Sequence, residues 1–232
     1  MKHIRHLFRY LFLGLVLTSC SFQHEGIFTD DRSEEYDLYD YYIDKYGNEG
    51  IIAYISSDRK SIIAISLDES LESWGPTDQK IYKNEKASGY NLPSFGVLMH
   101  QTMFSLGIEN FPAQYWCNNK NRWESHPRAG SWRLPTYHEF RVICGTDGEN
   151  VDFLNEALEG VNGTPLRSKQ MYWSCVEDHE AIIYFEGLET DYDPANRAIV
   201  STPEKSSYSY KDRWLKKNQY YVRAIKYVYY AN

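Results

Sequence analysis

The stretch 130–140, Gly-Ser-Trp-Arg-Leu-Pro-Thr-Tyr-His-Glu-Phe, constrains this chain most because it fixes where a helix must begin. Pro135 disfavours the helical conformation for the residue before it. Thr136 then occupies an N-cap position, and Glu139 follows three residues later, so the two side chains can form a capping box. Such a cap is worth about 1 kcal/mol. We therefore expect a helix from residue 137, with Trp132 held beside its start as a core anchor.

Residues 1–19 have the pattern of a targeting segment. Lys2, Arg5 and Arg9 form a basic start, and the apolar run 10–17 is too short to span a bilayer. The run ends in Leu-Thr-Ser-Cys at 17–20, which resembles a bacterial lipobox whose cysteine is acylated. We expect a lipoprotein signal peptide at 1–19, a palmitate-type lipid on Cys20, and an outer-membrane lipoprotein of the cell envelope. The alternative is an ordinary secretory signal that contains a cysteine.

Charge argues against nucleic acid as a partner. Removing residues 1–19 removes three basic residues and no acidic ones, which leaves 22 Lys and Arg against 32 Asp and Glu, a net charge near −10. Such a chain has no basic stripe to release counterions from a phosphate backbone. Segment 20–46 is rich in acidic residues and tyrosines, and we interpret it as a tether. Its part 33–46 could instead pack on the domain that follows.

The rest of the chain predicts one domain with mixed secondary structure. The β-branched runs 50–55 and 61–67 flank a polar turn and predict a hairpin. Helices are expected after Pro93 and at 151–158. Strands are expected at 172–175, 181–185 and 220–228, with a long polar connection at 186–219. The spacing of the helix after Pro93 predicts a solvated His100 and a buried stripe formed by Phe95, Leu98, Met99, Thr102, Met103 and Leu106.

Three segments together resemble the Lcl C-terminal / Fibrobacter major paralogous (FISUMP-like) domain family, which is common in Bacteroidetes-type lipoproteins. They are Trp132–Thr136, Tyr172–Glu177 and Val222–Ile225. The resemblance covers most of 47–232 and implies a single C-type lectin-like domain of the α+β class. That fold would have small twisted antiparallel sheets, paired N- and C-terminal strands, two or three helices, and a long irregular loop region that carries the binding function.

The three cysteines beyond Cys20 leave two arrangements open. Either one disulfide forms, for which Cys144–Cys175 is the favoured pair, or Cys117, Cys144 and Cys175 are all buried thiols. A nucleophile built from Cys175 with His138 or His179 would lack a third group to orient the histidine. The chain is therefore expected not to be an enzyme.

Oxygen-rich residues at 186–196 raise the question of calcium. Asp191, Asp193 and Asn196 form a compact turn that could supply several of the six to eight oxygens calcium requires. The same residues also simply favour turns. The histidines lack zinc-ligand spacing. We expect no cofactor and no metal site, and calcium at Asp191, Asp193 and Asn196 is the alternative.

Aromatic residues divide into expected core and expected contact positions. Trp132 and Trp173, flanked by apolar residues, should be buried. Trp214 lies in a charged segment and, with Tyr192 of the polar connection, is the candidate for ligand contact. Arg223 lies in an apolar strand and needs a carboxylate, for which Glu139 and Glu177 are the candidates.

These observations favour a membrane-anchored, exported lipoprotein with a ligand-binding or adhesion module, whose partner is a glycan or a surface protein. An alternative is a structural subunit of a surface appendage, which would have a donated or removable strand near its N-terminus. An enzyme acting on envelope glycans would need an acid–base pair in a cleft, and the residues single out no such pair.

Overall fold

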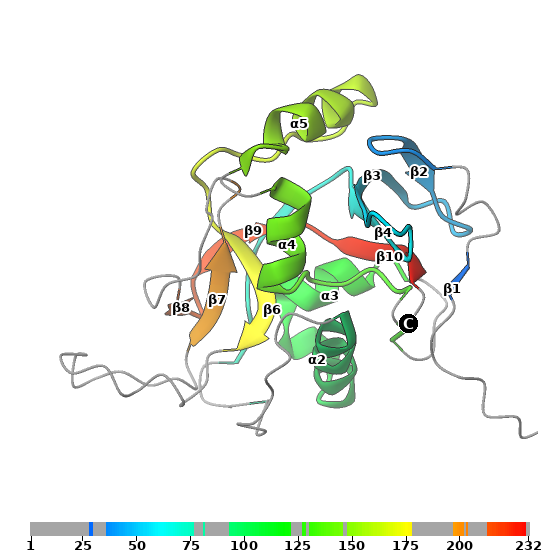
Figure 1. Cartoon of the computed structure of the whole chain (residues 1–232). Helices are drawn as coiled ribbons and strands as arrows, with labels where there is room; N and C mark the ends of the chain where they lie inside the picture. The colour runs from blue at the N-terminus through cyan, green and yellow to red at the C-terminus, as the bar shows by residue number, and fades with distance from the viewer. Residues whose placement is uncertain are drawn as a thin grey trace, which may run out of the picture.

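The computed structural model describes residues 28–29, 36–76, 81, 93–121, 127–128, 130–145, 148–177, 197–201, 203 and 213–230. These residues form an α+β fold with two five-stranded sheets and four α-helices (Figure 1). The predicted α+β class is thus confirmed. The signal peptide, Cys20, Asp191, Tyr192, Asp193, Asn196 and the expected strand 181–185 lie outside the described residues.

The first sheet has the strand order β1-β10-β4-β3-β2. Its centre is the predicted hairpin, β3 (Glu49–Ile55) and β4 (Ser61–Ser66), closed by a turn in which Ser56 N–H donates to Ser61 O (2.9 Å). Strand β10 (Ile225–Tyr230) pairs antiparallel with β4 on one side and with β1 (Phe28–Thr29) on the other. The first and last strands are therefore joined, as the family resemblance implied.

Strand β2 (Tyr41–Ile43) forms the other end of the first sheet by pairing with β3. The sequence left residues 33–46 open between tether and domain. Their described part, from Tyr36 onward, belongs to the domain: Tyr36 and Tyr42 are buried in the core, and so is the carboxylate of Asp44.

The second sheet has the strand order β5-β9-β6-β7-β8. Strand β6 (Tyr172–Glu177) is buried along its whole length, between β9 (Gln219–Val222) and β7 (Arg197–Ser201). Strands β5 (Ser70–Ser73) and β8 (Arg213–Leu215) complete it. The single strand expected at 220–228 is divided into β9 and β10, because the chain passes from the second sheet to the first at residues 223–224.

Four α-helices pack on these sheets. Helix α4 (Tyr137–Cys144) begins at the predicted capping box: the Thr136 hydroxyl accepts from Glu139 N–H, and the Glu139 carboxylate accepts from Thr136 N–H. Helix α5 (Val151–Gly160) lies at the top of Figure 1, whereas α2 (Pro93–Ser105) and α3 (Pro112–Asn118) lie below. In the described part, no helix is long and apolar enough to cross a bilayer.

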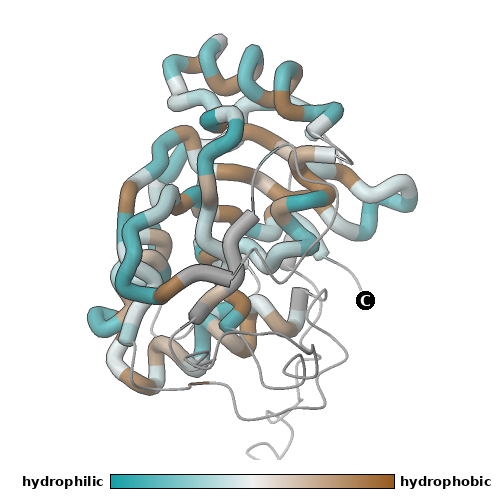
Figure 2. Tube along the Cα trace, turned by 90° about the vertical axis from the view of Figure 1, so that its left-hand side faces the viewer, coloured by the Kyte–Doolittle hydropathy of each residue, from teal (hydrophilic) through white to brown (hydrophobic). Residues whose placement is uncertain are grey.

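The first sheet is covered on both faces, so the core has two halves. One half includes Ile52, Ala64 and Trp132, and the other includes Ile51, Ile65 and Phe140. This alternation along β3 and β4 is the period of two expected of a sheet buried on both faces. Figure 2 shows mixed hydrophobic and hydrophilic positions along the helix at the top of the molecule, α5.

Helix α2 departs from the predicted orientation. Phe95, Met99 and Met103 are buried as expected, but Leu98 and Leu106 are 43% and 39% exposed, and His100 is fully buried. The expectation of a solvated His100 was wrong. The helix is rotated so that His100 reaches α3, where its Nε2 lies 3.0 Å from the Asn118 side-chain oxygen. That polar partner offsets the cost of burying the imidazole.

Candidate functional site

The capped turn of α4 contains a buried ion pair at the centre of the molecule. Arg133 binds the Glu139 carboxylate with both terminal nitrogens, at 2.8 and 2.6 Å. Tyr227 of β10 adds a third bond, its hydroxyl donating to Glu139 Oε1 at 3.0 Å. Both charged side chains are at most 2% exposed. Glu139 thus serves at once as helix cap and as counterion, which joins α4 to the first sheet.

Trp132 is as buried as predicted, and its indole nitrogen finds a partner that the sequence did not indicate. The indole N–H donates to the Asp44 carboxylate (2.9 Å), which also accepts from Asn48 and Lys226. Burial alone would raise the pKa of Asp44, but the hydrogen bonds from Asn48 and Trp132 outweigh it and lower the pKa. Asp44 is therefore a charged anchor that ties the β2 segment to the capped turn.

Arg223 has a different partner from the two predicted. Its guanidinium pairs with Glu69 (3.0 Å) and donates to the carbonyl oxygens of Ser66 (2.9 Å) and Thr164 (2.7 Å). The expected pairing with Glu139 or Glu177 is wrong, because those carboxylates bind Arg133 and Lys216. Arg223 lies where β9 leaves the second sheet, so its guanidinium meets the turn after β4 instead.

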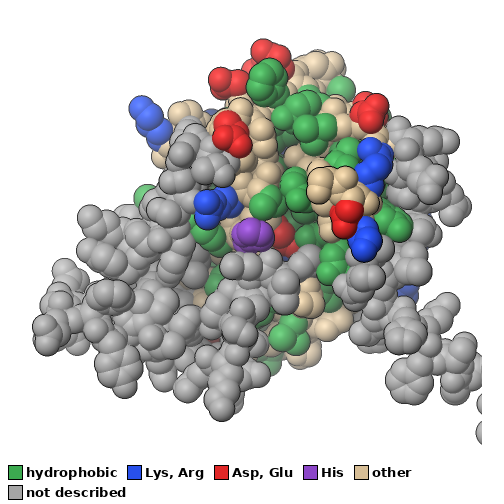
Figure 3. All heavy atoms as spheres, in the orientation of Figure 1, with side chains coloured by type: hydrophobic (Ala, Val, Ile, Leu, Met, Phe, Trp, Pro, Cys, Tyr) green, Lys and Arg blue, Asp and Glu red, His purple; other side chains and the backbone are tan. Residues whose placement is uncertain are grey.

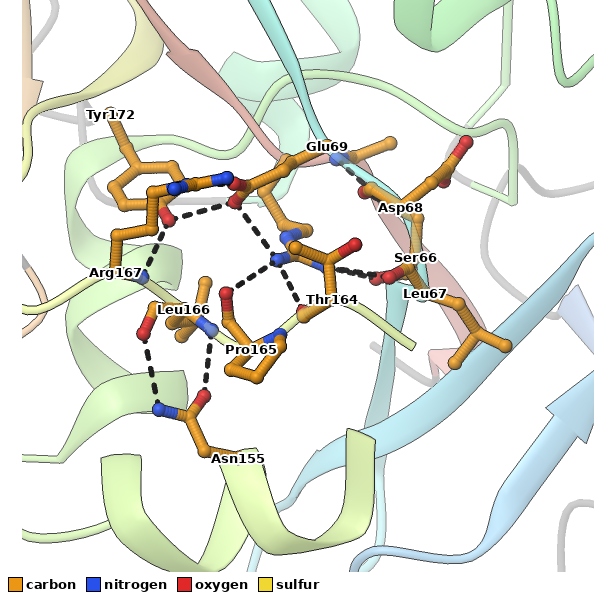
Figure 4. A network of polar contacts seen from close by, with 12 residues as sticks. Ser66, Leu67, Asp68, Glu69, Asn155, Thr164, Pro165, Leu166, Arg167 and Tyr172 are labelled. Carbon is orange, nitrogen blue, oxygen red and sulfur yellow. Dashed lines mark hydrogen bonds and ion pairs between the residues drawn. The ribbon is translucent and has the colours of Figure 1, made fainter. Parts of the chain in front are cut away.

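The Glu69 carboxylate gathers several elements around Arg223 (Figure 4). It also accepts from the Tyr172 hydroxyl (2.9 Å) and pairs with Arg167. Next to it, Asn155 of α5 bonds both backbone groups of Leu166, at 3.1 and 2.7 Å. The network binds the loop after α5 to both sheets.

Glu177, the last residue of β6, forms another fully buried ion pair. Its carboxylate pairs with Lys216 and accepts from the backbone N–H of Ile81 (2.9 Å). The Lys216 ammonium lies 4.8 Å from the centre of the Trp74 ring, a cation–π arrangement. Trp173, buried as predicted, donates its indole N–H to the Glu72 carbonyl (2.9 Å). Glu177 and Trp173, like Trp132, Glu139 and Arg223, therefore hold parts of the fold together.

The thiols are buried and inert. Cys117, Cys144 and Cys175 are at most 1% exposed and none of the three is in a disulfide, so the favoured Cys144–Cys175 pairing was wrong. Burial raises the pKa of Cys175 to about 12, which leaves almost no thiolate at neutral pH. His138, proposed as its base, is exposed on α4. Cys175 thus lacks the properties of a nucleophile.

His100 is a buried group whose proton affinity is displaced by its surroundings. Burial lowers its pKa to about 4, and the nearby charge of Arg133 acts in the same direction, against the hydrogen bond to Asn118. The imidazole is neutral at physiological pH. Among the described residues, no three His, Cys, Asp or Glu side chains are grouped to hold a metal ion.

Of the predicted contact residues, only Trp214 falls within an element that the structure describes. It lies in β8, where it pairs with Ala198 of β7. The residues that sequence reasoning missed, Glu69, Asp44 and Lys216, lie in segments with several charges, so nothing local marked them as the ones that would be buried. The fold alone brings Glu69 to Arg223 and Asp44 to Trp132, so no local sequence signal could have found these pairs.

Comparison with known proteins finds a structure of similar fold but assigns the chain to no family. No family model matches the chain, and no curated protein sequence matches it. Among solved structures, it is similar to a fimbrial protein from Bacteroides ovatus ATCC 8483, with a TM-score of 0.55 and 13% sequence identity. The match covers 82% of this chain and 48% of that one, so this chain spans about half the length of the fimbrial protein.

Proposed function

We propose that this protein is a lipid-anchored component of a cell-surface appendage, in which its domain binds other protein components. The observation that carries the proposal is the fold likeness to a fimbrial protein over most of this chain. In this proposal Cys20 carries the lipid and the protein is located at the cell surface. Its domain binds other proteins there, not glycans. The C-type lectin-like ancestry implied by the resemblance is part of the same proposal.

The arrangement of charge supports a binding role over a catalytic one. The central carboxylates Glu139, Glu177, Glu69 and Asp44 each bind a cation within the fold. An acid–base catalyst needs a group that can change its protonation while it contacts a substrate. These four carboxylates are instead committed to holding helices and sheets together.

The sheet order supports assembly through strands. Within the described residues, strand β1 pairs with β10 at two positions, Phe28 with Tyr230 and Thr29 with Tyr229, whereas β10 is six residues long. A short terminal strand at a sheet edge is easily displaced. Strand β1 therefore has the property expected of an appendage subunit whose N-terminal strand is donated or removed during assembly.

The test uses the native host expressing the epitope-tagged full chain. Appendages are sheared from the cells, and the tagged protein is measured in the sheared fraction, the membrane fraction and on intact cells treated with protease. We expect protease-sensitive protein on intact cells and co-purification with sheared filaments. Cys20→Ser should abolish incorporation of an alkyne fatty-acid label, whereas Gln23→Ala should not. Protein confined to the periplasm and missing from the sheared fraction would refute the proposal.

A further inference from the structure

Large apolar side chains gather on one surface formed by α5 and the β2 segment. Phe153 is 60% exposed, and Leu38, Tyr41 and Ile43 are each at least 40% exposed. The Tyr39 ring stacks on Phe153 at 6.4 Å between centroids, which brings the two elements together. We call these five residues the α5–β2 surface.

The register of the first sheet places Tyr41 and Ile43 on the same side as α5. Tyr41 is the cross-strand partner of Ile51, which packs in the half of the core that contains Val151 and Leu154 of α5. Cross-strand partners share a face of a sheet. Phe153 lies next to this buried stripe of α5 but outside it, so it extends the apolar area outward.

The same surface is acidic. In segment 37–49 the exposed charges are Asp37, Asp40 and Glu49, against Lys45, whose ammonium lies 4.8 Å from the Tyr46 ring. Helix α5 carries only acidic charges, at Asp152, Glu156 and Glu159, and all three are exposed. Figure 3 shows acidic and hydrophobic side chains together at the top of the molecule, over α5.

One charge on α5, that of Glu159, is placed unfavourably for the helix by itself. Glu159 lies in the last turn, which contains no basic residue, and the carbonyl end of a helix carries a partial negative charge. A cation placed there would relieve this repulsion. The helix end is thus electrostatically complementary to a basic partner.

We infer that the α5–β2 surface is a docking site for a basic, apolar segment of another protein, one that carries lysine or arginine among hydrophobic residues. Opposite charge steers such a segment to the surface, and the exposed rings supply the contact that it buries. An anionic membrane and nucleic acid are negatively charged and would be repelled by this surface. The same surface of a second copy is also acidic and would be repelled in the same way. The inference concerns the domain alone, so it stands whether or not the chain belongs to an appendage.

The test measures peptide binding by fluorescence anisotropy to the full chain, purified in detergent. Three twelve-residue peptides are compared: alternating lysine and leucine, alternating lysine and serine, and alternating glutamate and leucine. We expect the lysine–leucine peptide to bind at least about tenfold more tightly than either of the others, because it alone supplies both charge and apolar contact.

Variants then locate the binding. Phe153→Ala, and separately the double change Asp152→Asn with Glu156→Gln, should each weaken binding of the lysine–leucine peptide by about tenfold. The matched controls are Leu98→Ala on α2, which has a similarly exposed side chain, and Glu109→Gln, an exposed carboxylate in the short helix Ile108–Asn110. Neither control should change the affinity, and thermal melting of each variant should match the wild type.

Several outcomes would overturn the inference. If the lysine–serine peptide bound as tightly as the lysine–leucine peptide, the binding would depend on charge alone and not on the apolar side chains. If the two control variants weakened binding as much as Phe153→Ala, the peptide would bind elsewhere. A concentration-dependent dimer in sedimentation that Phe153→Ala abolishes would make a second copy the occupant. Any of these leaves the shearing experiment on whole cells unaffected, so the two proposals fail separately.

Discussion

Replacing Glu139 by alanine tests whether the capped turn of α4 holds the fold together. The change leaves the Arg133 guanidinium without its counterion in the interior, where it is 1% exposed. Breaking a buried pair in this way costs about 3–5 kcal/mol. It also removes the acceptor of Thr136 N–H, a cap worth about 1 kcal/mol. We expect a loss of about 4–6 kcal/mol, which is comparable to the whole free energy of unfolding of many domains.

Urea denaturation followed by tryptophan fluorescence measures this loss. His138→Ala is the control, because His138 is exposed on the same turn of α4 and its loss should change the free energy of unfolding by less than about 0.5 kcal/mol. The double change Arg133→Met with Glu139→Leu should be less damaging than Glu139→Ala, since no unpaired charge remains. A loss below about 1 kcal/mol for Glu139→Ala would refute the structural role assigned here.

Three further predictions follow from the buried groups. Gly96→Ala, which would favour an ordinary helix by about 1 kcal/mol, should lower the unfolding free energy by about 1–3 kcal/mol. The reason is that a Cβ there would lie 2.5 Å from Nη1 of Arg133, and calorimetry with Ser94→Ala as control decides the sign. Because the pKa of His100 is lowered to about 4 in the folded state, the unfolded state binds more protons as pH falls from 6.5 to about 4. The free energy of unfolding should therefore decline by roughly 3 kcal/mol over that range, and by much less in His100→Gln. Urea denaturation at a series of pH values measures both. Alkylation at pH 8 followed by mass spectrometry should label the buried thiols only after denaturation, and rapid labelling of the native chain would contradict their burial at Cys117, Cys144 and Cys175.

Local signals in the sequence were sufficient where the physics is local. The capping box needs only Thr136 and Glu139, three residues apart, and the hairpin β3–β4 needs only two apolar runs and a polar turn. Both form as predicted. Helix α2 also forms, but its periodicity predicted a solvated His100, whereas contact with Asn118 of α3 accompanies the burial of that side chain.

Pairings between distant charges could not be predicted in the same way. Arg223 was expected to need a carboxylate, and it has one, but Glu69 lies 154 residues away in sequence. The choice of Glu69 depends on the crossing from β9 to β10, which brings Arg223 to the turn after β4. Lys216 and Glu177 meet through the order of the second sheet, which no local pattern specifies.

The pairing of β1 with β10 has a mechanical consequence for an anchored chain. A pull on the N-terminus reaches the described fold at Phe28, where two residue pairs resist it, and this strand yields first. Further along the described chain, Asp44 holds the segment that begins at Tyr36 through its bonds to Trp132 and Lys226. An anchor of the kind proposed would therefore load the two residue pairs of β1 with β10 before it loads the buried contacts of Asp44.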